Sequence, residues 1–257
     1  MTQSESKLTT NIQAAKAAGR LALVPFIPGG FPNREQFRKE VEELAASGAD
    51  IIEIGMPFSD PVADGPVVER ASLQCLEDGV NLKWIMSTLQ DMNIQGPALI
   101  LMGYYNPVLQ HGLDKFAEDA SKANVSGVII PDIPFEESDE LKAALAKYGI
   151  VLIPLVGMNT SKERMELYAK EAKGFVYFVS VLGTTGGTVT LPDTIKEKLK
   201  MTADVFDVPI ALGFGLKHPD QLKELEGLVD AAVFGSALIQ HIEEGQSSAS
   251  FMERWTK

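Results

Sequence analysis

One carboxylate lies in a segment that otherwise has the character of a buried strand. Glu53 is enclosed by apolar residues in the run Ile51-Ile52-Glu53-Ile54. A carboxyl in such a place must be hydrogen-bonded, paired with a base, or raised in pKa. A raised pKa suits general acid–base catalysis near neutral pH, which contributes about 10²- to 10⁴-fold. The alternative is a structural Glu53 paired with lysine or arginine, but the neighbouring apolar runs contain no basic residue. The sequence therefore favours a catalytic Glu53.

A second carboxylate follows in a loop of restricted conformation. The segment from Pro57 to Pro66 holds three prolines, two aspartates and a glycine, so few backbone conformations are open to it. Asp64 precedes Gly65-Pro66 and is either the N-cap of the next helix or a second catalytic carboxylate. The spacing alone slightly favours the cap, because Asp followed by Pro is a common helix start.

Glycine pairs near the end of the chain predict an anion site. Gly213-Phe214-Gly215 and Gly235-Ser236 each follow an apolar run. Glycines let backbone amides approach an anion, and the start of a following helix adds a favourable dipole. A further segment of small and hydroxyl residues, 182–190, is either a mobile lid or an inert loop.

Apolar and aromatic side chains accompany these loops and predict a ligand with a flat apolar part and an anionic tail. The residues concerned are Leu23, Met102, Tyr104, Ile129, Tyr177 and Phe214.

These candidates must be positioned by a repeated pattern of apolar runs and amphipathic segments. The runs are continuously apolar, as in strands buried on both faces of a parallel sheet. The expected strands are Leu21–Ile27, Asp50–Gly55, Ala98–Met102, Val128–Pro131, Val151–Leu155, Phe175–Val179, Pro209–Gly213 and Ala231–Phe234. The expected helices are Thr10–Ala18, Arg34–Ser47, Pro66–Asp78, Leu82–Met92, Leu113–Ala123, Glu136–Tyr148, Ser161–Ala172, Leu191–Thr202, Pro219–Leu225 and Ser236–Glu244.

Eight evenly spaced βα units favour an α/β fold of the (β/α)₈ TIM barrel type, with Thr10–Ala18 as an extra N-terminal helix. An open doubly wound sheet is the alternative. The 257 residues fit one barrel domain, 1–257, because such barrels use roughly 200 to 250 residues. In a barrel the active site lies at the carboxyl ends of the strands, where all the candidates above occur.

Composition excludes several classes of function. A net charge of −12 without a basic cluster argues against nucleic-acid and membrane-surface binding. One cysteine and a polar start predict a cytoplasmic protein. The uncharged stretch from Met92 to Leu113 is long enough for a membrane span, but prolines and amides interrupt it.

The residue inventory also narrows the chemistry. No expected strand contains a lysine for a Schiff base, and the three histidines, His111, His218 and His241, are dispersed rather than spaced as metal ligands. Nucleotide-binding and nucleophile-elbow motifs are missing as well. A metal-free carboxylate mechanism is what we expect.

Several of these segments resemble those of a known protein family. The segment Glu53-Ile-Gly-Met-Pro-Phe-Ser-Asp-Pro-Val-Ala-Asp-Gly-Pro66 closely resembles the signature of the tryptophan synthase alpha subunit. The resemblance extends over essentially the whole chain, through Tyr104-Tyr105-Asn106-Pro107, Pro131-Asp132-Ile133-Pro134 and the two glycine pairs.

The resemblance implies cleavage of indole-3-glycerol phosphate to indole and glyceraldehyde 3-phosphate in tryptophan biosynthesis. It makes Glu53 the general acid–base and makes Asp64 the group that stabilises positive charge at the indole N–H, which moves the interpretation of Asp64 from cap to catalyst. Thr185 in the lid would hydrogen-bond Asp64 on closure. Phosphate is expected on the amides of Gly186, Gly215, Gly235 and Ser236, and the indole ring against Leu23, Met102, Ile129, Tyr177 and Phe214.

The resemblance also implies a partner. Family members work with a pyridoxal-phosphate β subunit in an α–β–β–α complex, so this chain needs no cofactor of its own. The contacting face would include Pro57, Asp60, Asn106 and Leu109. The alternatives are a weakly catalytic subunit that binds ligand and activates its partner, a stand-alone indole-releasing lyase, and another phosphate barrel acting on sugar isomers.

Overall fold

The strands form one parallel sheet around a central axis. The computed structural model describes residues 6–180, 191–213 and 215–256. The strand order is β5-β4-β3-β2-β1-β9-β8-β7-β6. The bounds are β1 Ala22–Pro28, β2 Ile51–Gly55, β3 Ala98–Met102, β4 Val125–Ile129, β5 Val151–Leu152, β6 Leu155–Gly157, β7 Val176–Val179, β8 Ile210–Gly213 and β9 Ala231–Phe234.

The short strands β5 and β6 close the sheet into a barrel. They are the two halves of one extended segment, which was expected as a single strand over Val151–Leu155. Its first half pairs with β4 and its second half with β7. Between the halves, Ile153 N–H donates to the carbonyl of Val128 at 2.9 Å, and Tyr177 N–H donates to the carbonyl of Pro154 at 3.0 Å. The eight expected strands therefore form a (β/α)₈ barrel, and the open doubly wound sheet is excluded.

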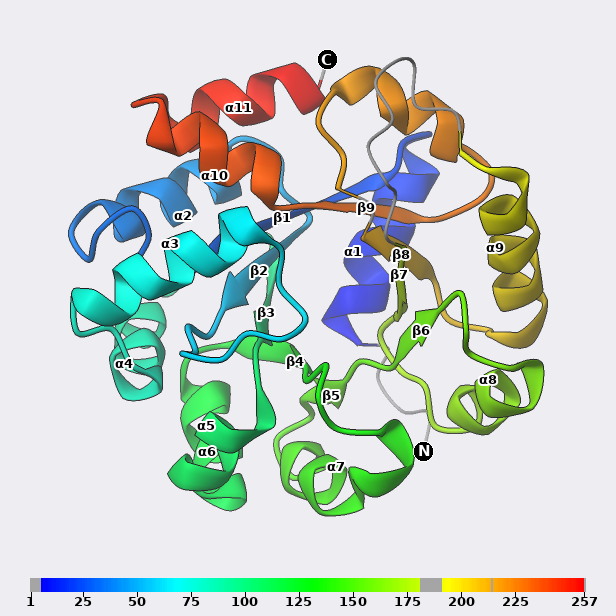
Figure 1. Cartoon of the computed structure of the whole chain (residues 1–257), viewed down its shortest axis with the longest axis horizontal. Coiled ribbons are helices and arrows are strands. Elements are labelled where there is room, and N and C mark those ends of the chain that lie inside the picture. Colours follow the sequence, from blue (N-terminus) through cyan, green and yellow to red (C-terminus); the bar gives the residue numbers. More distant parts are fainter. Residues whose placement is uncertain (1–5, 181–190, 214, 257) are drawn as a thin grey trace.

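The helices lie around this barrel (Figure 1). Their bounds are α1 Lys7–Ala17, α2 Gln36–Ala46, α3 Pro66–Glu77, α4 Leu82–Met92, α5 Tyr105–His111, α6 Leu113–Lys122, α7 Asp139–Ala146, α8 Lys162–Ala169, α9 Asp193–Val205, α10 Ser236–Glu243 and α11 Ser248–Trp255, with 3₁₀ turns η1 Phe135–Glu137 and η2 Pro219–Leu225.

Several elements differ from the sequence prediction. Helix α5 was expected as loop because of Pro107, but a proline in the first turn costs a helix no hydrogen bond. Helix α11 was not expected; it spans eight residues and packs on α2. The predicted helix Glu136–Tyr148 divides into η1 and α7, and Pro219–Leu225 is a 3₁₀ turn rather than an α-helix. Among the helices of the described residues, none has the length and apolar character that a bilayer crossing requires.

The side chains along each strand alternate between two apolar layers, one inside the barrel and one under the outer helices. Ile52 and Ile54 belong to the layer between the strands and the outer helices, as expected. Ile51 belongs to the layer inside the barrel, together with Ile129 and Tyr177. Because side chains alternate along a strand, Glu53 faces the interior of the barrel with Ile51.

Helix α1 closes the amino-terminal end of the barrel. Its residues Leu8, Ile12 and Ala15 pack in the interior layer. Just after the helix, Arg20 makes a bidentate ion pair with Asp50, at 2.6 and 2.9 Å. With this end closed, the carboxyl ends of the strands form the open mouth of the barrel.

We predict that Ile12→Ala lowers the free energy of unfolding by about 2–5 kcal/mol, because it leaves a cavity in a fully buried layer. Urea unfolding followed by circular dichroism measures this change. Thr10→Ala, on the exposed side of the same helix, is the control. A loss in Ile12→Ala no larger than that in Thr10→Ala would contradict a packing role for Ile12.

Candidate active site

Glu53 is a buried acid without a hydrogen-bond partner among the described residues. The residue is 1% exposed, and neither carboxylate oxygen has a hydrogen-bond partner within the described ranges. Burial, reinforced by the negative charge of Asp64, raises the pKa of Glu53 from its ordinary value of 4.5 to about 8. The alternative of an ion-paired structural glutamate is therefore excluded for the described residues. Glu53 can give a proton at neutral pH.

Asp64 is not the cap of the following helix. The N-cap of α3 is Gly65, which makes no side-chain cap hydrogen bond, so the interpretation that the spacing alone favoured is wrong. Burial and the charge of Glu69 raise the pKa of Asp64 to about 6, while a hydrogen bond from the Tyr104 hydroxyl works in the opposite direction. Asp64 is thus a half-buried carboxylate that ionises below neutral pH.

Tyr104 holds the Asp64 loop in place. Its hydroxyl accepts a hydrogen bond from Ala63 N–H at 2.9 Å, and its ring stacks on Phe58 with centroids 5.2 Å apart. Tyr104 is buried at the end of β3, where it was predicted to contact substrate. In this structure it contacts the loop that carries Asp64.

Tyr177 links the two carboxylates to the opposite wall of the barrel. Burial raises the pKa of its hydroxyl, and the charges of Glu53 and Asp64 raise it further. Its ring lies against Gly213 at the end of β8, where a Cβ would come within 2.5 Å of the Tyr177 hydroxyl oxygen. Both acids and this hydroxyl thus share one electrostatic environment at the mouth.

Of the predicted ring-contacting residues, three lie in or on the interior layer. Ile129 and Tyr177 belong to it, and Met102 packs against it. Leu23 does not: it is the second residue of β1 and belongs to the layer under the outer helices. The expectation for Leu23 is corrected by the alternation of β1, and Phe214 lies outside the described residues.

Two apolar residues at the mouth were missed. Leu155 packs against the interior layer. Phe26 packs with residues of the outer layer as well, but its ring lies against Gly55 and Gly235 near the carboxyl end of β1. The sequence does not show which residue of β1 pairs with Glu53. The register between β1 and β2 is needed to identify that residue as Phe26.

The predicted anion site is partly described. Gly215 has a positive φ of 66°, a conformation that glycine adopts without strain. Gly235 is the N-cap of α10, and Ser236 begins that helix. Strands β8 and β9 are neighbours in register, so these backbone amides meet at the same edge of the mouth. Thr185 and Gly186 lie outside the described residues.

Among the described residues, no group of three or more His, Cys, Asp or Glu side chains is arranged to hold a metal ion. The arrangement that is present consists of two carboxylates, an apolar interior and helix-terminal amides.

The residues predicted to contact a partner lie at the surface beside the mouth. Asp60 and Asn106 are exposed, Pro57 is partly exposed, and Leu109 on α5 is 49% exposed. Val62 in the Asp64 loop, which was not predicted, is 85% exposed. An apolar side chain this open at the tip of a loop is consistent with a protein contact.

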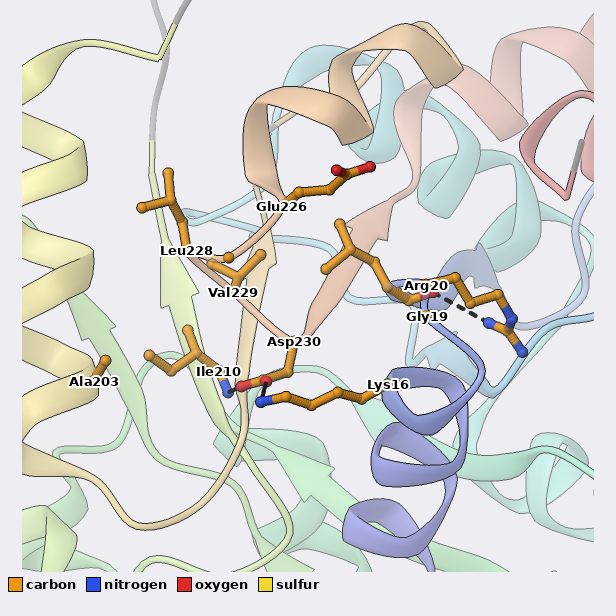
Figure 2. Close-up of a pocket in the computed structure, with 11 residues that line it drawn as sticks. Lys16, Gly19, Arg20, Ala203, Ile210, Glu226, Leu228, Val229 and Asp230 are labelled. Carbon is orange, nitrogen blue, oxygen red and sulfur yellow. Dashed lines mark hydrogen bonds and ion pairs between the residues drawn. The ribbon is translucent and has the colours of Figure 1, made fainter.

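A separate hollow of about 380 Å³ lies at the opposite end of the barrel (Figure 2). Its charged side chains are largely satisfied: Lys16 pairs with Asp230, and Arg20 pairs with Asp50. Asp230 also accepts a hydrogen bond from Ile210 N–H at 2.9 Å. These contacts join α1 to the strand starts, so the hollow is part of the closed end and not of the acid pair.

Comparison with known proteins agrees with this geometry. The family model described as tryptophan synthase alpha chain matches residues 12–256. The chain is 65% identical over 253 residues to the tryptophan synthase alpha chain of Maridesulfovibrio salexigens, covering 98% of this chain and 99% of that one. It is 59% identical over 253 residues to the chain of the same name from Solidesulfovibrio magneticus, with the same coverage.

Solved structures agree in fold as well. A structure of Mycobacterium tuberculosis tryptophan synthase superposes with a TM-score of 0.89 at 30% identity, covering 98% of this chain and 96% of that chain. A tryptophan synthase subunit alpha from Legionella pneumophila gives a TM-score of 0.86 at 28% identity, covering 98% and 99%.

The raised pKa of Glu53 makes a prediction about stability. Between pH 4.5 and about 8 the folded protein binds more protons at Glu53 than the unfolded chain does, so stability falls as pH rises through this window. Glu53→Gln, which cannot ionise, should be more stable than the parent at pH 8.5 by on the order of 4–5 kcal/mol. The difference should vanish near pH 4.

Urea unfolding at both pH values measures this difference. Glu42→Gln removes an exposed glutamate from α2 and is the control for the substitution itself. A constant difference between Glu53→Gln and the parent at all pH values would contradict a neutral, buried Glu53.

Proposed function

The chain belongs to the tryptophan synthase alpha chain family and is a lyase that cleaves indole-3-glycerol phosphate in tryptophan biosynthesis; we propose that Glu53 and Asp64 carry out this cleavage. The observation that supports the assignment best is Glu53 itself, an acid without a partner among the described residues that is buried in the barrel interior. The substrate is cleaved without a metal, to indole and glyceraldehyde 3-phosphate.

Glu53 acts first as an acid and then as a base. With a pKa of about 8 it is protonated at neutral pH and delivers its proton to indole C3. The resulting carboxylate takes the proton of the substrate hydroxyl next to the bond that breaks. As the carbon–carbon bond breaks, its electron pair restores the aromatic indole and the hydroxyl carbon becomes the aldehyde.

Asp64 stabilises the charge that the first step creates. Protonation of C3 leaves positive charge on the indole nitrogen. Asp64 has a pKa of about 6, so it is ionised at neutral pH and can accept a hydrogen bond from the indole N–H. A charge held ready in a partly dehydrated site stabilises a transition state more than it would in water.

The phosphate of the substrate binds the amides of Gly215, Gly235 and Ser236. A chain with a net charge of −12 repels anions at long range, but the amino end of α10 offers unpaired N–H groups and a favourable dipole. On the sequence resemblance, Gly186 adds to this phosphate contact, Phe214 to the ring contact, and Thr185 closes over Asp64.

The apolar part of the site receives the indole ring. Met102, Ile129, Tyr177 and the newly identified Leu155 surround the interior at the mouth. Phe26, rather than Leu23, is the residue of β1 that contributes to this apolar set. Such side chains hold a flat ring and exclude water from the reacting carbon.

Substitution and pH profile test the assignment together. Glu53→Gln is expected to lower indole release at least 10³-fold, and Asp64→Asn at least 10-fold, with the fold retained. For the parent, kcat/KM should rise through about pH 6 as Asp64 ionises and fall through about pH 8 as Glu53 ionises. Spectrophotometric detection of indole measures both.

An active Glu53→Gln variant would overturn the assigned role. The same assay separates the alternatives. If the isolated chain alone reaches the turnover of the complex, it is a stand-alone lyase; if Glu53→Gln leaves activation of the partner intact, the chain acts there as a ligand-binding subunit.

We infer that the partner is the pyridoxal-phosphate-containing β subunit, in an α₂β₂ complex that receives indole directly. The face beside the mouth supports this: Leu109 and Val62 are exposed apolar residues next to Pro57, Asp60 and Asn106. A cytoplasmic location and a single domain over residues 1–257 belong to the same proposal.

Leu109→Glu is expected to weaken the affinity for the β subunit at least 10-fold without changing the fold, because it places a charge in an apolar contact. Leu167→Glu on α8 is the matched control, since Leu167 is exposed to a similar extent, 46% against 49% for Leu109. Size-exclusion chromatography and activity titration measure binding. Equal binding by both variants would place the interface elsewhere.

A further inference from the structure

We propose that Phe26 is a positioning residue that keeps Glu53 away from water and fixes its place relative to the phosphate-binding amides. This inference rests on the proposed roles of Glu53 and of the amides of Gly235 and Ser236. Phe26 itself was not among the residues that the sequence singled out.

Phe26 is the direct neighbour of Glu53 in the barrel. The two residues are register partners between the parallel strands β1 and β2, and Phe26 is 9% exposed. Glycines on both sides show that its ring lies inside the barrel. Gly55, two residues after Glu53 and therefore also inward-facing, meets the tip of the ring. An aromatic ring in this place replaces the water that would otherwise hydrate the carboxylate.

The ring fills the space between two glycines. A Cβ on Gly55 would lie 2.7 Å from Phe26 Cζ, and a Cβ on Gly235 would lie 2.8 Å from Phe26 Cδ1. Both distances are shorter than side-chain contacts allow. Gly235 has a φ of −128°, which is outside the positive-φ region that favours glycine, and the Phe26 ring leaves no room there for a Cβ.

This packing connects the acid to the anion site. One end of the ring touches the strand that carries Glu53, and the other end touches the residue that caps α10. Protein interiors are close-packed, so a change at one end displaces groups at the other. The Phe26 ring thus fills the space between the strand of the proton donor and the residue that begins the phosphate site.

The first test removes the ring and reads the titration of Glu53. Phe26→Leu and the unbranched Phe26→Met, which remove the ring and leave side chains of similar volume to each other, should shift the basic limb of the kcat/KM profile down by at least one pH unit. Activity at pH 8 should fall about 10-fold, with a smaller loss at pH 6.5. A second buried phenylalanine, Phe178 on β7, which lies between neighbours Val176 and Val179 in the same strand and is 0% exposed, provides the control Phe178→Leu.

Phe178→Leu should lower the thermal midpoint of unfolding by an amount similar to that of Phe26→Leu. It should leave the basic limb of the kcat/KM profile unchanged. If Phe26→Leu and Phe26→Met leave the limb in place, Phe26 does not keep Glu53 dry, and the proposal is overturned. That outcome differs from failure of the proposed function, which an active Glu53→Gln variant would show.

A second test reads the anion site and does not depend on the Phe26 variants being stable by themselves. Gly55→Ala should push the ring tip toward Gly235 and weaken the binding of inorganic phosphate at least 5-fold, although Gly55 does not belong to the phosphate site. Isothermal titration calorimetry with inorganic phosphate measures the dissociation constant.

Combining Gly55→Ala with Phe26→Leu should restore most of that loss, because leucine has no atom at the Cζ or Cε positions that the new methyl group meets. Additive losses in the double variant, or unchanged phosphate binding in Gly55→Ala, would each refute the connection through the ring.

Discussion

The burial of an ionisable group in an apolar interior constrains the rest of this molecule. The interior around Glu53 is formed by apolar side chains from the surrounding strands and by the ring of Tyr177. A carboxylate in such surroundings loses its hydration, and neither of its oxygens has a hydrogen bond among the described residues to compensate. The folded protein therefore favours the protonated form of Glu53. Packing elsewhere in the barrel must offset the free energy lost by burying this group.

The two ends of the barrel divide structure and chemistry between them. At the amino-terminal end, α1 fills the interior with apolar side chains and Arg20 pairs with Asp50. At the carboxyl end, the same strands terminate in glycines and loops that leave the interior open to a ligand. The packing at the closed end stabilises the barrel, while the open end contains the buried acid. This division agrees with the general placement of active sites at the carboxyl ends of the strands in such barrels.

The sequence could predict those features of the fold and site that depend on local pattern. The apolar runs predicted the places of all eight strands, although β4 spans Val125–Ile129 rather than the expected Val128–Pro131. Glu53 was found because a carboxylate interrupts one of these runs. The glycines at 215 and 235 were found for a similar local reason, since each follows a strand. Helix α5 was missed because its proline was interpreted as a break, whereas its position in the first turn is what allows it.

Features that depend on the pairing register between strands could not be predicted from local pattern. Leu23 and Phe26 lie in one apolar run, and only the register between β1 and β2 shows that Phe26 and not Leu23 is beside Glu53. Asp64 presented a related difficulty. Its spacing is compatible with a cap, and only the folded loop shows that Gly65 takes the cap position while Tyr104 bonds the aspartate.

Tyr104 also shows how the partner face and the acid pair are joined. Its backbone is the N-cap of α5, the helix that carries Leu109, while its hydroxyl bonds Ala63 N–H next to Asp64. The next residue, Tyr105, donates its N–H to Asp132 at 2.9 Å, which fixes the start of α5 to the loop after β4. A displacement of α5 therefore cannot leave the Asp64 loop unchanged unless the hydrogen bond from Ala63 breaks. Since Asp64 in turn raises the pKa of Glu53, the surface of α5 and the buried acid belong to one connected set of contacts.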